Sequence, residues 1–154
     1  MQSTTRLLLL LALLLPPAGI RAQELRDSAH PAFIELVPTE GRASVHLAAS
    51  QVVRIGRAEG YTVIDTTAWV QQRTIESIDA VARRLEAAGQ RFVPLTDLAN
   101  NRIYLAVDRI VLVRGSEERH ANGARAAIVM VGLRFNTDVA VRESVEQVMA
   151  ALAR

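Results

Sequence analysis

Two segments of the chain carry apolar residues at the spacing of one helix face, and short alternating runs occupy much of the remaining sequence. In Ile78–Leu85 the apolar residues recur at i, i+3, i+4 and i+7, which is typical of an amphipathic helix. Ser77 can cap this helix by accepting a hydrogen bond from an unpaired first-turn amide. Gly89 can end it in a left-handed conformation at little steric cost. The pattern therefore predicts one helix between Ser77 and Gly89.

The second segment, Val145–Leu152, repeats this pattern near the end of the chain. Ser144 precedes it, and Gln147 three residues later completes an S-x-x-Q capping box. The residues just before each helix also align, and the two segments keep a constant offset of 67 positions. The sequence therefore predicts two helices of common design.

The alternating runs predict two similar sets of β-strands. The first set comprises Phe33–Val37, Ala43–Leu47, Gln51–Arg57 and Tyr61–Thr66. Trp69–Ile75 is either a fifth strand or an extended lead into the helix. The second set comprises Phe92–Leu95, Ile103–Ala106, Ile110–Val113 and Ala127–Val131. Pro94 lacks a ladder amide, so we expect its strand at a sheet edge or with that position turned outward.

The spacing between the two sets indicates an insertion in the second one. The offset is 58 at Leu47/Leu105 and 67 in the helices, so the second set has gained about nine residues after its third strand. We place them in the polar run Ser116–Arg125. Asn122-Gly123 is a favoured type I′ turn pair, which predicts an elongated hairpin tip there.

Together these patterns predict an α+β protein of two tandem antiparallel β-meander units, each closed by a C-terminal amphipathic helix. The first repeat spans residues 33–89 and the second spans residues 92–154, so only Gln90 and Arg91 separate them. Because so short a linker cannot let two domains move independently, we expect a pseudo-symmetric pair that shares a core.

Residues 1–22 have the layout of a secretory signal peptide. Arg6 supplies positive charge, and Leu7–Leu15 is an apolar run shorter than the roughly 20 residues of a membrane-spanning helix. We expect cleavage after Ala22, a polar lead-in over residues 23–32, and a periplasmic or secreted protein without a stable membrane span. An uncleaved anchor and a buried apolar N-terminus are the alternatives.

Loss of this segment changes the charge of the chain. The full sequence has 18 Lys+Arg and 16 Asp+Glu residues, and removal of Arg6 and Arg21 leaves 16 of each. Nucleic-acid binding is not expected of such a chain, since it depends on a concentrated positive field. The absence of cysteine excludes disulfides, cysteine nucleophiles and cysteine metal sites.

The residues most often used in catalysis do not form a recognisable site. His46 alternates with Val45 and Leu47, which favours an exposed strand position. His120 lies beside acidic residues in the inserted run, where a mobile tip does not favour metal binding. Glu76 and Glu143 directly precede the helix caps, and a structural role at the helix start explains both. We therefore predict no catalytic residue, no cofactor and no metal ligand.

A family resemblance covers the second repeat and, more faintly, the first. It rests on Phe92-Val93-x-Leu95-Thr96, Ile103-x-Leu105, Asp108-x-Ile110 and the closing Val141–Val148, read as VRESVEQV. These residues resemble the small flagellar and swarming motility (FlbD-type) protein family, here as two tandem diverged copies. Family members are single units without an export signal. The resemblance therefore implies a fold, and it does not transfer motility.

We expect an exported, non-enzymatic binding or structural protein, associated with the envelope or with motility, whose partner is a protein. The candidate partner surface comprises His46, Tyr104, Glu117, Glu118, Arg119 and His120, and a partner could also add a strand to a free sheet edge. Trp69 is expected to cover the edge of the core. A small periplasmic enzyme with a site between the repeats is one alternative. An intracellular regulatory nucleic-acid-binding domain is the other, if the N-terminus is not a signal.

Overall fold

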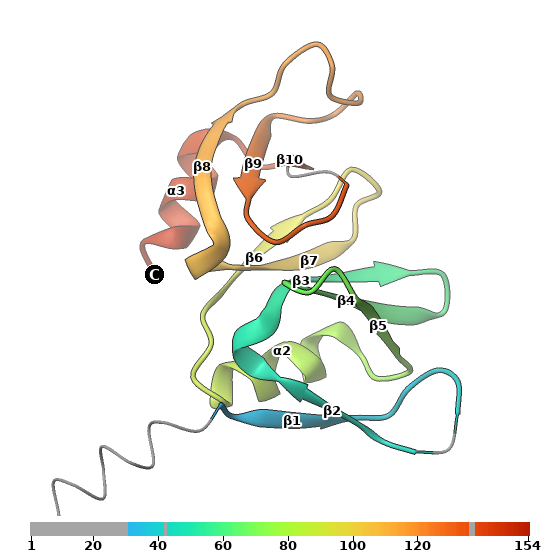
Figure 1. The fold of residues 1–154 in the computed structure, drawn as a ribbon. Helices are drawn as coiled ribbons and strands as arrows, with labels where there is room; N and C mark the ends of the chain where they lie inside the picture. Colours follow the sequence, from blue (N-terminus) through green and yellow to red (C-terminus); the bar gives the residue numbers. More distant parts are fainter. Residues whose placement is uncertain (1–30, 42, 136–137) are drawn as a thin grey trace, which may run out of the picture. The chain divides into compact units, whose positions relative to one another are not determined.

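The computed structural model describes residues 31–41, 43–135 and 138–154, and these residues form antiparallel β-strands with two short α-helices (Figure 1). The predicted α+β class is confirmed. The predicted signal peptide, its cleavage after Ala22 and most of the lead-in lie outside the described residues. Pro31–Arg154 form one compact unit.

The same order of elements occurs twice along this unit. The first half contains β1 (Phe33–Leu36), β2 (Val45–Ala48), the 3₁₀ turn η1 (Ala49–Gln51), β3 (Val52–Ala58), β4 (Tyr61–Thr66), β5 (Gln71–Thr74) and α2 (Ile78–Ala87). The second half contains β6 (Phe92–Thr96), β7 (Arg102–Ala106), η2 (Val107–Arg109), β8 (Ile110–Gly115), β9 (Ala126–Met130), β10 (Asp138–Val141) and α3 (Val145–Leu152).

The strands form three antiparallel sheets, whose orders are β1-β2, β5-β4-β3-β7-β6 and β10-β9-β8. Each half therefore contains a hairpin and a three-stranded meander instead of one continuous meander. The 3₁₀ turns interrupt the strand direction between hairpin and meander, so β2 does not pair with β3. β7 pairs with β3, which joins strands of both halves in one sheet. β6 is the edge strand of this sheet, as Pro94 predicted.

The predicted helix starts are confirmed. The Ser77 side chain accepts a hydrogen bond from the Ala80 amide, and Ser144 forms a complete capping box with Gln147. Both arrangements satisfy amides that a helix end leaves unpaired. Gly89, just after α2, has a φ of 90°, the left-handed conformation expected of the residue that ends this helix.

The two apolar helix faces differ in burial. In α2 all four predicted stripe residues are buried: Ile78, Val81, Ala82 and Leu85. In α3 only Val148 is buried, and Met149 is 52% exposed. The sequence predicted two equivalent stripes, and the structure covers one of them less completely.

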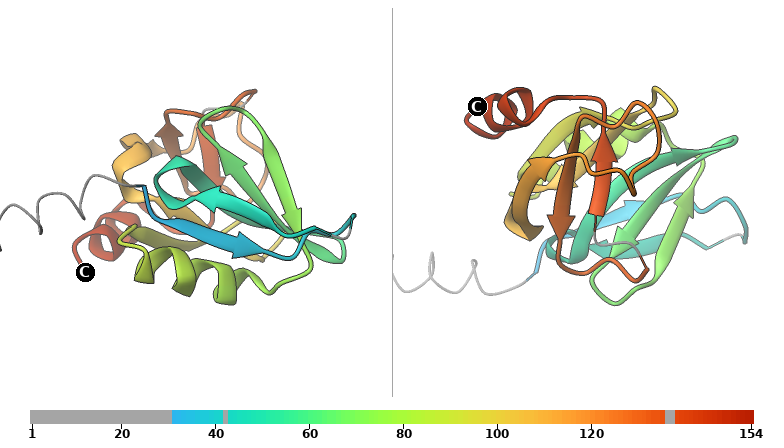
Figure 2. Two further views of the ribbon diagram at one scale, coloured as in Figure 1. Left: turned by 60° about the horizontal axis from the view of Figure 1, so that its bottom comes forward. Right: turned by 90° about the horizontal axis from the view of Figure 1, so that it is seen from above.

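Two hydrophobic clusters form the core, and each includes one buried residue from the other half. The first is built from β1 to β4 and α2, and it includes Tyr104 from β7. The second is built from β6, β7, β9, β10 and α3, and it includes Val53 from β3. Figure 2 shows α2 running below β1 in the left view, and β8, β9 and β10 side by side in the right view. The β3–β7 junction is therefore where the halves interlock.

The insertion in the second half is divided between two connections. Ile55 pairs with Ile64 nine positions later, whereas Val113 pairs with Ile128 fifteen positions later, so six extra residues lie between β8 and β9. The other three lie between β9 and β10. The prediction that Ser116–Arg125 holds all nine residues is wrong, because the offset between aligned helices and strands gives only the total number of inserted residues.

The predicted type I′ turn is also wrong. Gly123 has a φ of 92°, but Asn122 is not in the left-handed region that a type I′ turn requires at both central residues. The Ala124 amide instead closes a turn on the Ala121 carbonyl. The Arg125 amide bonds the Val141 carbonyl at 2.9 Å, so the end of this connection is attached to β10.

Candidate interaction surface

The junction of β3 and β7 shows how this fold covers a sheet edge. On the side away from β4, β3 pairs with β7 through Arg54–Leu105 and Ile55–Tyr104. Val53 lies at a β-bulge of β3 and is fully buried in the core of the second half. The strand edge and its bulged residue are thus both removed from solvent.

Two polar contacts reinforce this junction. Tyr104 Oη donates a hydrogen bond of 2.6 Å to Asp79 Oδ1 on α2, and Arg109 Nη2 donates one of 2.7 Å to the Ser50 carbonyl in η1. Burial and the bond to Asp79 raise the pKa of Tyr104 above its ordinary value. The tyrosine therefore keeps its proton and remains a donor.

β8 has the same place in the second half that β3 has in the first, but its outer edge is uncovered. Within the described residues, β9 is the only strand that pairs with β8. β8 also has a bulge, at Val111, which corresponds to Val53 in β3. Val53 is 0% exposed, whereas Val111 is 62% exposed.

Further exposed apolar side chains lie around this edge. We call the β8 surface the group formed by Val111, Leu112, Val131 and Met149, which are 44–62% exposed. The Val131 amide bonds the Arg109 carbonyl at the start of β8, and α3, which carries Met149, packs against β8. Grouped exposed apolar side chains mark interaction sites on proteins.

β2 has a second uncovered edge. In the part of the chain that the structure describes, β2 pairs only with β1. His46 is exposed on this strand, as predicted from its alternation with apolar neighbours. Unpaired amides and carbonyls at such an edge can accept a strand from another chain.

Tyr104, the predicted counterpart of His46, is not exposed. Only 9% of the residue is accessible, and its ring belongs to the first hydrophobic cluster. The prediction of an exposed sheet face around Tyr104 is wrong because β7 pairs with β3 of the first half, and the Tyr104 ring packs in the cluster that includes the apolar face of α2. Alternation within one strand could not reveal the second neighbour.

The other four predicted surface residues lie together in the β8–β9 connection. Asp138 on β10 is the anchor of this group: Arg114 Nη2 lies 2.6 Å from Asp138 Oδ2, and Arg119 forms a second ion pair with the same carboxylate. Burial opposes ionisation of Asp138, but the bonds from these arginines outweigh it and lower the pKa of Asp138. Glu117 joins both arginines, at 2.9 Å from Arg114 and 2.8 Å from Arg119.

His120 is part of the same group. Its side chain is 7% exposed, and its Nδ1 accepts a hydrogen bond of 2.7 Å from the Glu117 amide. The connection is therefore folded onto β10 by its charged residues, in contrast to the mobile tip that we expected. Glu118 is exposed, whereas Glu117, Arg119 and His120 each have structural contacts.

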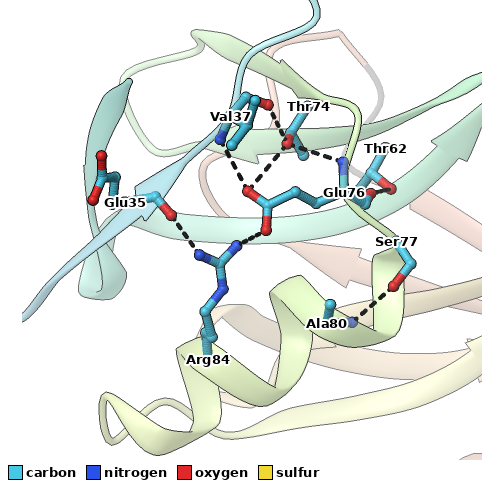
Figure 3. Close-up of polar contacts among 8 residues, drawn as sticks. All are labelled: Glu35, Val37, Thr62, Thr74, Glu76, Ser77, Ala80 and Arg84. Carbon is cyan, nitrogen blue, oxygen red and sulfur yellow. Dashed lines mark hydrogen bonds and ion pairs between the residues drawn. The ribbon is translucent and has the colours of Figure 1, made fainter. Parts of the chain in front are cut away.

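Glu76 and Glu143 each bind a backbone amide at the end of the first strand of their half. Glu76 Oε1 accepts from the Val37 amide at 2.9 Å, and Glu143 Oε2 accepts from the Thr96 amide at 3.1 Å. Figure 3 shows Glu76 held between Val37, Thr74 and Arg84. The carboxylates that sequence analysis gave a structural role thus fasten the first strand of each half to the helix start.

One pocket lies beside the connections that follow β4 and β9. It has a volume of about 460 Å³, and Arg54, Asp65, Trp69 and Phe135 are among its lining residues. Asp65 is the single acidic residue of this lining, and its oxygens accept bonds of 2.7 Å from Arg54 and from Gln71. Trp69 is 61% exposed with a φ of 62°, so the prediction that it covers the core edge is wrong.

No cluster of three or more His, Asp or Glu side chains suited to a metal ion occurs among the described residues. In the same part of the chain, no helix combines the length and the apolar character needed to cross a membrane. No protein-family model, curated protein or solved structure matches the chain.

Sequence reasoning missed the β8 surface. Val53 and Val111 are both valine, so their opposite exposures leave no trace in the sequence. Two other positions did carry a signal: Leu112 and Met149 stand where the first half has Arg54 and Ala82. An apolar residue that replaces a charged one, and a large one that replaces a small one, would have indicated additional contacts in the second half.

Proposed function

We propose that the chain is an exported, non-enzymatic protein that binds a protein partner by strand addition at the outer edge of β8. The observation that carries this proposal is the contrast between Val53, fully buried beneath the second half, and Val111, which is 62% exposed at the matching bulge. A strand added to β8 would cover its unpaired backbone groups and this side chain together.

We also propose that the two halves are diverged copies of one unit, packed as a pseudo-symmetric pair. The matching element order supports this proposal, as do the matching bulges and the two glutamates that bind equivalent amides. The resemblance to the FlbD-type family stays a prediction, and motility is not proposed from it.

The binding role is favoured over catalysis by the chemistry of the pocket. Acid–base catalysis needs a group that can exchange a proton with a substrate at a suitable pH. Asp65 is already bound by Arg54 and Gln71, and the lining contains no histidine. The site between repeats that an enzyme would need is therefore not supported by these residues.

A photo-crosslinking amino acid at position 111 tests the proposal in the cells that produce the protein. We expect an adduct whose crosslinked peptide, identified by mass spectrometry, belongs to a β-strand of a partner. Leu112→Lys, which adds a charge at the same edge, should abolish the adduct. The control is a crosslinker at Val70, which is 58% exposed in the β4–β5 connection. Equal adducts from both positions, or none from position 111, would refute the proposal.

A further inference from the structure

We infer that the partner of β8 is β2 of a second copy of this chain, so that copies join head to tail. This inference rests on the proposed function, because it names the strand that the β8 edge receives. It also provides a partner strand for the second free edge, which is that of β2. The contact inside the chain between β3 and β7 serves as the template, since β8 corresponds to β3 and β2 corresponds to β7.

The template specifies the register of the new contact. In the chain, Ile55 of β3 pairs with Tyr104 of β7. The equivalent positions, 58 residues away in each case, are Val113 of β8 and His46 of β2. An antiparallel pairing of Val113 with His46 of the next copy would therefore continue the arrangement that already joins the two halves.

The apolar side chains at this edge agree with the template. Val53 at the β3 bulge enters the core of the following half, and Val111 at the β8 bulge would enter the first half of the next copy. In the same register Val111 would lie beside Ala48 of β2, which is partly exposed, whereas its counterpart Ala106 on β7 is fully buried beside Val53.

The polar groups at the contact are also complementary. Tyr104 on β7 donates a hydrogen bond to Asp79 on α2. The equivalent positions are His46 on β2 and Glu146 on α3, both exposed in the single chain. An imidazole N–H can donate to a carboxylate as a tyrosine hydroxyl does. His46 of one copy could therefore donate a hydrogen bond to Glu146 of the next copy, although both residues differ in type from Tyr104 and Asp79.

Such a contact does not close on itself. It joins two different surfaces of the chain, and contacts of this kind produce rings or open filaments, whereas a symmetric contact stops at a dimer. In Figure 1, β2 lies at the bottom and β8 lies beside α3 above the five-stranded sheet, so the two edges are on separate sides of this sheet. Each copy could therefore engage two others.

A complementation experiment tests the inference on the full chain as recovered from cells. Val111→Lys blocks the β8 edge, and His46→Asp places a like charge opposite Glu146 at the β2 edge. Both side chains are exposed, so the fold should tolerate each change. By analytical ultracentrifugation, the wild type should form species larger than a dimer as its concentration rises. Each variant alone should sediment as a monomer, and an equimolar mixture should form a dimer and nothing larger.

Matched controls separate this result from a general effect of added charge. Val70→Lys and Ala99→Asp introduce the same charges at exposed positions outside the proposed contact, and both should assemble as the wild type does. The double variant His46→Asp with Glu146→Lys should regain self-association, because the exchanged charges attract each other between copies.

Three outcomes would overturn the inference. A wild type that stays monomeric at all concentrations would exclude self-assembly, and a position-111 adduct with another protein would then leave the proposed binding function intact. Dimers of His46→Asp alone would indicate symmetric pairing of two β8 strands. Failure of the variant mixture to form a dimer, while the wild type assembles, would show that β2 is not the strand received by β8.

Discussion

The hydroxyl of Tyr104 on β7 donates a hydrogen bond of 2.6 Å to Asp79 on α2, and this bond crosses the boundary between the two halves. The ring of Tyr104 lies in the core of the first half, although the residue belongs to the second. One side chain thus supplies both an apolar and a polar contact across the junction, and the two contributions can be separated by mutation.

We predict that Tyr104→Phe lowers the free energy of unfolding by about 1 kcal/mol, the net contribution of a typical hydrogen bond. Tyr104→Ala should cost about 3–5 kcal/mol, because it also removes a buried ring. Urea denaturation at low protein concentration measures both. The control is His46→Ala at the equivalent exposed position, which should stay within about 0.5 kcal/mol of the wild type. Equal losses for His46→Ala and Tyr104→Ala would contradict the assigned junction.

Val53 and Val111 form a matched pair for a second prediction. Val53→Ala removes two buried methyl groups and should lower the free energy of unfolding by about 2 kcal/mol. Val111→Ala removes the same groups from an exposed position and should change the stability of the dilute monomer by less than about 0.5 kcal/mol. Thermal or urea denaturation below the concentration at which copies associate distinguishes them. A large loss for Val111→Ala in a monomer would mean that this residue is covered within the chain.

Local patterns in the sequence predicted the helices, their serine caps and most of the strands, because these depend on residues close together in the chain. The stripe Ile78–Leu85 and the capping box at Ser144 needed no distant partner to be recognised. The pairing of β3 with β7 could not be predicted in this way. It depends on residues about 50 positions apart, and no local feature marks Tyr104 as a residue with neighbours on both sides.

The candidate surface was predicted only in part, because some of its residues depend on local patterns and others depend on distant contacts. Exposure of His46 followed from alternation, which is local. Burial of His120 followed from its position beside Asp138 on β10, which only the fold brings near. The free edge of β8 could not be predicted without the strand order. β7 pairs with β3, and among the described residues no equivalent strand pairs with the outer edge of β8.

Glu76 leads to a prediction of pH dependence. Burial alone would raise its pKa, but the hydrogen bonds from the Val37 amide and Arg84 outweigh burial and lower the pKa of Glu76. A carboxyl with a lowered pKa in the folded protein stabilises it above the unfolded pKa, and this contribution is lost as the pH falls through the folded value. The difference in unfolding free energy between wild type and Glu76→Gln should therefore be largest near neutral pH and shrink on acidification.

Urea denaturation of both proteins from pH 7 to pH 3 measures this change. Glu59→Gln, in the exposed turn between β3 and β4, is the control and should follow the wild type at every pH. A difference between wild type and Glu76→Gln that grows as the pH falls would have the opposite sign and would contradict the role of the Glu76 carboxylate.

Export leads to a prediction about the N-terminus. If residues 1–22 are a signal peptide, the protein recovered from the envelope compartment should begin at Gln23, as intact-mass measurement would show. Substitution of Ala22 by a large residue such as Leu should cause the uncleaved chain to accumulate, because signal cleavage requires small residues at this point. A full-length chain found only in the cytoplasm would instead favour the intracellular alternative.

The Val53 side chain packs closely against Gly132 at the junction. Substitution of Gly132 should therefore lower the free energy of unfolding more than substitution of another glycine with similar backbone geometry. A Cβ atom at Gly132 would lie 2.9 Å from Val53 Cγ2, and its φ of 96° already disfavours other residues. Gly60 has a φ of 81°, but a Cβ there would meet open space. Gly60→Ala should therefore cost about 1–2 kcal/mol from backbone strain alone.

Gly132→Ala should cost more than Gly60→Ala, because Val53 must move as well. Combining Gly132→Ala with Val53→Ala should recover part of this additional loss, since the smaller side chain leaves room for the new methyl group. A double-mutant cycle by urea denaturation measures the coupling. Additive effects of the two substitutions would show that Val53 does not contact Gly132.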